Sequence, residues 1–192
     1  MPLSHLDKNS ALIVVDMQKG IVGLPTAHPA DQITANNAKL ARSFRARGLP
    51  VVLVNVKGTA PGRIAMSHNY QLPPDWADLV PELEEHPDDH KVTKLQWGAF
   101  HGTSLDQFLR RRGVTQVVLS GIATSIGVES TARNAHDHGY HVALVVDAMT
   151  DLDPISHQHS VEKIFPRLGQ TTTTEELLTI LDDQADCQKS MA

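Results

Sequence analysis

The chain has little cysteine, few aromatic residues and no excess of basic charge. Its 192 residues include one cysteine, Cys187, and aromatic residues make up 4% of the total. A single cysteine cannot form an internal disulfide, and no cysteine–histidine cluster has zinc spacing. The net charge of -5 argues against a nucleic-acid or membrane-surface binder, which normally carries a basic patch.

Long apolar runs are missing as well. None approaches the roughly 20 residues that span a bilayer. The first ten residues, MPLSHLDKNS, lack the apolar core of a signal peptide. We therefore expect a cytoplasmic protein. The length and a 41% hydrophobic content are typical of one α/β domain covering residues 1–192.

A helical segment, a glycine and a short apolar run follow one another three times. Glycine suits the left-handed position just past a helix, and the β-branched runs lack the alternation of half-exposed strands. This pattern predicts parallel strands covered on both faces, hence a doubly wound sheet of about six strands with helices on both sides. The three helix–strand pairs are 41–48 with 49–56, 105–113 with 114–121, and 130–139 with 140–147.

Further elements are expected around these pairs. Strands are predicted at 11–18, 92–94 and 165–170, and a last helix at 174–181. The proline-rich segment 57–89 is typical of a long functional loop with one short helix near 76–83.

An acid, a base and a glycine-flanked turn are predicted at one edge of this sheet. Asp16 follows the first strand, Lys94 ends the strand near 92–94, and residues 121–127 lead from a strand into a helix. Ligands of open α/β sheets bind beyond the carboxyl ends of the strands. The turn would offer backbone N–H groups to a developing oxyanion. Taken singly, each residue also suits a plain role as turn former, solvated lysine or packing glycine.

Three blocks carry a resemblance to a known family: VVDMQ at 14–18, KLQWGAFHGTSLDQFL at 94–109, and the stretch from GIATSIGVESTAR to DAMTD at 121–151. Their order and spacing resemble the isochorismatase-like (cysteine hydrolase) family. The resemblance implies a six-stranded parallel sheet, a hydrolase acting on a small molecule, and association into a homodimer or larger homo-oligomer.

The resemblance also implies roles for single residues. Asp16 matches the catalytic aspartate of the family, and Lys94 matches its catalytic lysine. The Ile122–Ala123 bond matches a non-proline cis peptide that turns backbone N–H groups toward an oxyanion. Gly127 stands where amidase members carry the nucleophilic cysteine, so a thioester route is closed and the chain resembles a Gly-for-Cys branch.

The departures narrow the reaction. Nicotinamidases carry an Asp-x-His metal motif after the second strand, where this chain reads NVKGTA, so we expect no metal and no cofactor. True isochorismatases also have glycine at the nucleophile position; their aspartate protonates a vinyl ether and water adds to the cation. They show Tyr-Ala-His where this chain has Ala123, Thr124 and Ser125, so isochorismate itself is not favoured.

We expect hydrolysis of a vinyl ether or amide by Asp16 and Lys94, and Lys94 would also hold a substrate anion. The missing side chain at Gly127 would leave space for the attacking water. Candidate substrate contacts are Gln18, Trp97, Phe100, Thr124 and Ser125. Two alternatives stay open. One is a catalytically inactive binding or regulatory protein, and the other uses Thr124 or Ser125 as nucleophile, although no adjacent histidine base is evident from the sequence.

Some residues have plainer interpretations. The clusters His86–Asp88–Asp89–His90 and Asp151–Asp153–His157–His159 have the residue types of metal ligands but are more typical of solvated turns. Cys187 lies in a polar tail, so its alkylation is expected to leave function unchanged.

Overall fold

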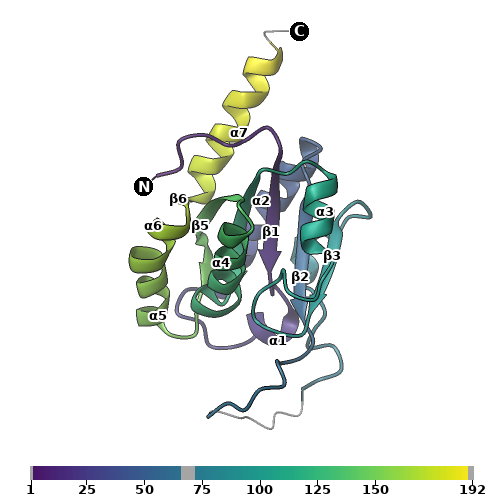
Figure 1. Ribbon diagram of the computed structural model, residues 1–192, viewed down its shortest axis with the longest axis vertical. Coiled ribbons are helices and arrows are strands. Elements are labelled where there is room, and N and C mark those ends of the chain that lie inside the picture. Colours follow the sequence, from purple (N-terminus) through teal and green to yellow (C-terminus); the bar gives the residue numbers. More distant parts are fainter. Residues whose placement is uncertain (1, 66–71, 190–192) are drawn as a thin grey trace.

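A computed structural model describes residues 2–65 and 72–189, and the side chains within these ranges up to residue 184. Six parallel strands form one sheet in the order β3-β2-β1-β4-β5-β6 (Figure 1). The direction of winding reverses between β1 and β4, and ligands of such sheets bind at this switch point. The strands are β1 (Ser10–Val15), β2 (Val51–Val56), β3 (His90–Lys94), β4 (Gln116–Ile122), β5 (His141–Thr150) and β6 (Gln170–Thr172).

Helices cover both faces of the sheet. Figure 1 shows α3 (Leu105–Arg111) and α4 (Glu129–Asp137) in front of the sheet and α2 (Ala30–Ala46) behind it. Alternate residues of the fully buried β1 separate the two cores: Ile13 packs with the residues of α3 and α4, and Leu12 with those of α2 and α7 (Thr174–Lys189). Burial on both faces is why this strand is apolar from Ala11 to Val15.

The remaining elements are short. They are α1 (Lys19–Val22), a 3₁₀ turn η1 (Pro81–Leu83), a π-helical turn η2 (Thr124–Val128), α5 (Pro154–His159), a second π-helical turn η3 (Ser160–Ile164) and α6 (Phe165–Leu168). Among the described residues, no helix combines the length and apolar character that a bilayer crossing requires.

The repeated helix–glycine–strand pattern is confirmed. Gly48, Gly113 and Gly139 follow α2, α3 and α4 with φ of 67°, 64° and 80°. These are left-handed conformations that glycine adopts without the clash of a Cβ. Each glycine therefore ends a helix and turns the chain into the next strand.

Three expectations near the sheet margins were wrong in detail. The strand predicted at 165–170 is instead α6 followed by the three-residue β6, because Phe165 packs as a helical residue in the core shared with α3 and α4. The last helix runs to Lys189 and not to 181, since no glycine or proline interrupts it. The helix expected near 76–83 is reduced to η1, where Pro81 sits at the first position.

Candidate functional site

Asp16 is the first residue beyond β1, at the switch point of the sheet. Its backbone is left-handed, with φ of 53°, and its N–H donates to the carbonyl of Val54 at 2.9 Å. Asp tolerates this conformation better than most residues, although it still costs free energy. The chain therefore leaves the strand abruptly at the residue that carries the carboxylate.

Lys94 ends β3, two strands away from β1, and its side chain reaches back to Asp16. The ammonium Nζ donates to Oδ2 of Asp16 at 2.7 Å and to the carbonyl of Gln96 at 3.1 Å. The two side chains are 2% and 6% exposed. Residues 78 positions apart thus form a buried ion pair, as the common sheet edge predicts.

The pKa of the Asp16 carboxyl lies close to neutral pH. Burial raises its pKa from 3.8 to about 6, and the charge and hydrogen bond of Lys94 oppose that rise. Oδ1 is buried and has no hydrogen-bond partner among the described residues. A buried acceptor left without a donor costs about 1–3 kcal/mol, so a donor brought within hydrogen-bond distance of this oxygen would stabilise it.

The turn between β4 and α4 lies directly against β1. Gly121 has φ of 115°, and a Cβ there would overlap the carbonyl oxygen of Val15, so only glycine allows the two strands to approach this closely. The Ile122–Ala123 peptide bond is cis.

Several N–H groups of the turn already have acceptors within the protein. Ser125 N–H donates to Oδ2 of Asp151 at 2.7 Å, and Ile126 and Val128 both donate to the carbonyl of Ala123. The Asp151 carboxylate therefore caps the start of η2. Fewer backbone N–H groups of this turn are therefore free to bind an oxyanion than the sequence predicts.

Gly127 does not provide the free space that its missing side chain suggests. A Cβ built there would lie 3.0 Å from Oδ2 of Asp16 and 3.1 Å from Cγ1 of Val15, and both distances are tighter than ordinary contacts. The expectation of spare room at this position was wrong, because the carboxylate itself fills the space. Because Gly127 has no side chain, the π-helical turn η2 can pack directly against the carboxylate of Asp16.

Asp16, Lys94 and Gly127 line a cavity of about 270 Å³. Its walls come from the carboxyl ends of the strands, from α1 and from the segment after β2. The predicted 57–89 loop contributes to the cavity of its own chain through Gly58, Thr59 and Trp76. The other lining residues are Ile21, Leu24, Val56, Trp97, Ile122, Ala123, Ile126 and Leu152.

Of the predicted substrate contacts, Trp97 lines the cavity and is 63% exposed. Gln18 and Phe100 do not line it. The Gln18 amide is fully buried and bonds to the backbone of Val56 and Trp76, so it ties the cavity walls together. Phe100 is a core residue packed beside Tyr140.

Thr124 is fully buried and does not line the cavity. Its hydroxyl lies 2.8 Å from Nδ1 of His157, the adjacent histidine that the sequence did not reveal. Burial, and to a smaller extent His28, lowers the pKa of His157, whereas Asp151 opposes the shift. No local signal could have paired residues 33 positions apart; the contact depends on α5 folding back onto η2.

The two acidic–histidine clusters have structural explanations. Asp89 forms a two-pronged ion pair with Arg45, with contacts of 2.9 and 2.8 Å. Asp153 caps α5 by accepting from the N–H groups of Ile155 and Ser156. Within 2–65 and 72–184, no three His, Cys, Asp or Glu side chains gather as metal ligands would. The side chain of Cys187 lies outside the described residues.

Comparison with known proteins gives one consistent family. The isochorismatase domain family matches residues 10–176. The isochorismatase family protein YwoC of Bacillus subtilis is 41% identical over 179 residues, which cover 89% of this chain and 93% of YwoC.

Solved structures agree with this result. An isochorismatase family protein of Burkholderia thailandensis has a TM-score of 0.83 and 41% identity, covering 93% of this chain and 98% of that one. N-carbamoylsarcosine amidase of Thermoplasma acidophilum has a TM-score of 0.70 and 28% identity, covering 86% and 96%. The chain belongs to the isochorismatase family.

Proposed function

We propose that this protein is a hydrolase in which Asp16 moves the protons and water, not a protein side chain, is the nucleophile. The observation that carries the proposal is the buried pair of Asp16 and Lys94 at 2.7 Å. Oδ1 of Asp16 has no partner among the described residues, and Asp16 lines a cavity. The hydrolytic relatives support the reaction class. The position of a nucleophilic cysteine is occupied by Gly127.

Hydrolysis by water needs one group that takes a proton and returns it. For an amide, Asp16 takes a proton from water as the water oxygen bonds to the carbonyl carbon. Asp16 then delivers a proton to the leaving nitrogen as the C–N bond breaks. For a vinyl ether, Asp16 first gives a proton to the alkene carbon and regains one from the water that adds to the cation. The hemiketal formed in this way then breaks its C–O bond, as its hydroxyl loses a proton to become the carbonyl and the departing alcohol oxygen gains one. A pKa of about 6 suits both directions near neutral pH.

Lys94 has a supporting role in either route. Its ammonium keeps the Asp16 carboxyl from becoming still more basic and fixes Oδ2, so Oδ1 is the oxygen left to exchange protons. Gly127 supports the same geometry, since any larger residue would press on Oδ2.

The alternative with Thr124 as nucleophile has one observation in its favour, the contact with His157. The position of the hydroxyl opposes it, because Thr124 is fully buried and lies outside the cavity lining. Ser125 does not line the cavity either, and its N–H is held by Asp151.

The test is a turnover screen of small amides, ureides and vinyl ethers in H₂¹⁸O. We expect the heavy oxygen in the product after a single turnover, no covalent adduct by intact-protein mass spectrometry, and loss of turnover in Asp16→Asn. A trapped acyl-enzyme would contradict water as the nucleophile. Ligand binding without turnover of any compound would favour the inactive binding protein. Self-association stays a prediction, to be checked by light scattering.

A further inference from the structure

We infer that the cavity beside Asp16 selects an uncharged small molecule with a flat or aliphatic apolar body and a hydrogen-bond donor, and excludes carboxylates. The inference rests on the proposed function, since it names the substrate class of the same site. It departs from the expectation that Lys94 holds a substrate anion.

The charges that line the cavity cancel each other. Of the described lining residues, Asp16 and Lys94 are the two with charged side chains, and they are bonded to each other. Lys94 also donates to the carbonyl of Gln96, so two of its three donors are engaged within the protein. A carboxylate entering this space would meet the Asp16 carboxylate without a free cation to balance it.

The walls make such an anion more costly still. Isoleucine, leucine, valine and tryptophan side chains dominate the lining. Transfer of an unpaired anion from water into apolar surroundings is strongly unfavourable, and proteins usually hold carboxylates with arginine. No arginine lines the cavity in the described part of the chain.

Hydrogen-bonding capacity gives a second, independent argument. Oδ1 of Asp16 is a buried acceptor without a donor in the described part of the chain, and Asp16 lines the cavity. A carboxylate ligand brings acceptors alone, whereas an amide N–H or a hydroxyl brings the donor that this oxygen lacks. A neutral donor therefore gains a hydrogen bond where an anion adds repulsion.

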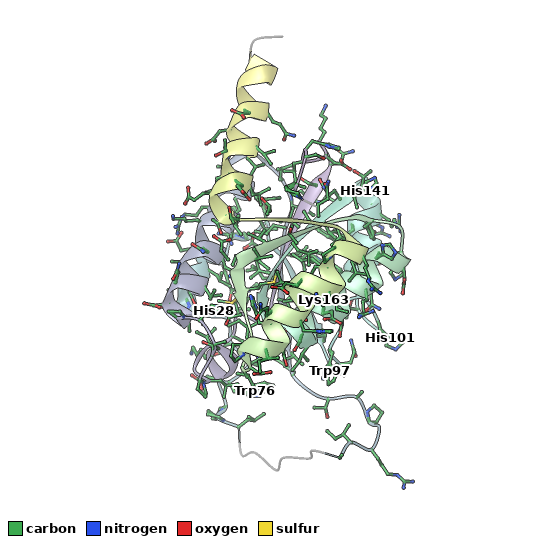
Figure 2. The ribbon with its side chains drawn as sticks, turned by 90° about the vertical axis from the view of Figure 1, so that its left-hand side faces the viewer. His28, Trp76, Trp97, His101, His141 and Lys163 are labelled. Atoms are coloured by element: carbon green, nitrogen blue, oxygen red, sulfur yellow. The ribbon has the colours of Figure 1, made fainter. Side chains whose placement is uncertain are left out.

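The two tryptophans indicate the shape of the ligand. Trp76 and Trp97 come from different segments, both line the cavity, and both lie at the end of the molecule opposite the C-terminus (Figure 2). Aromatic side chains favour flat apolar partners by stacking. A volume of about 270 Å³ lies just below the roughly 300–1,000 Å³ typical of drug-sized ligands, so a single ring with one polar group fits the space.

The decisive measurement compares neutral and anionic ligands of one shape. Benzamide and benzoate, then cyclohexanecarboxamide and cyclohexanecarboxylate, are titrated into the full chain by calorimetry at pH 8, where Asp16 is ionised. We expect each amide to bind at least about tenfold more tightly than its carboxylate. Benzoate should gain affinity below about pH 6, as Asp16 takes up a proton, and benzamide should change less.

A pair of matched variants tests the cause. Leu152→Arg adds a cation to the lining and should reverse the preference, so that benzoate binds more tightly than benzamide. Ile155→Arg adds the same charge nearby, at a position 76% exposed and outside the lining, and should leave the preference unchanged.

Equal affinities within both ligand pairs, no measurable binding of any of the four compounds, or tighter binding of the carboxylates at pH 8 would overturn the inference. None of these results would touch the proposed reaction, which is decided separately by turnover in Asp16→Asn.

Discussion

Replacement of Lys94 by methionine tests the electrostatics of the site most directly. The substitution keeps the length and apolar stem of the side chain but removes the charge 2.7 Å from Oδ2 of Asp16. An opposite charge this close lowers a carboxyl pKa by about one to three pH units. Lys94→Met should therefore raise the pKa of Asp16 from about 6 by that amount, leaving at least about half of the carboxyls protonated at pH 7.

The assay is the pH profile of kcat/KM for a substrate found by the screen. The limb of the profile that reports Asp16 should move up by the same one to three pH units. Lys91→Met is the control, since Lys91 lies on the same strand but is 61% exposed. A folded Lys94→Met protein whose limb stays in place, or moves down, would refute the assigned coupling.

The same variant makes a prediction about stability. The folded-state pKa of Asp16 lies above its unfolded value of 3.8, so the folded state binds this proton more tightly. The stabilisation that this proton gives the folded state is fully present below pH 3.8 and is lost as the pH rises through the folded pKa. In Lys94→Met the loss continues to higher pH. The deficit in unfolding free energy relative to wild type should widen between pH 5 and pH 9 by about 1–4 kcal/mol, measured by denaturant titration.

Three further predictions concern residues around the site. Gly127→Ala should push the neighbouring carboxylate by a few tenths of an ångström and lower kcat/KM by about tenfold without unfolding the protein; unchanged kinetics would contradict the close packing at this position. Gly121→Ala combines a left-handed φ with overlap of a backbone oxygen and should lower the free energy of unfolding by about 3 kcal/mol or more, as measured by thermal unfolding. Gly62→Ala, with no described atom within 4 Å of the new Cβ, should change stability by less than about 0.5 kcal/mol. Asp89→Ala leaves its arginine partner without a counter-charge and should cost about 3 kcal/mol, while Asp88→Ala, with a side chain 93% exposed, should cost almost nothing; equal losses would show that the ion pair is not what matters there.

Local sequence signals account for most of the fold. Glycines after helices and unbroken apolar runs predict the strand–helix repetition, because they reflect backbone conformation and two-sided burial, which act over a few residues. One exception is the segment 165–172, where a short stretch with few buried residues fits a helix or a strand equally well. Its outcome depends on packing against α4, which no local pattern encodes.

The site divides in the same way. Sequence alone predicted that Asp16, Lys94 and the turn at 121–127 would meet at one edge, because the carboxyl ends of parallel strands share that edge. The tertiary structure decided the properties of this site. Burial raises the pKa of Asp16, its carboxylate fills the space beside Gly127, and mostly apolar side chains line the rest of the cavity. These properties are sums over contacts between distant segments, and for that reason only the folded chain determines them.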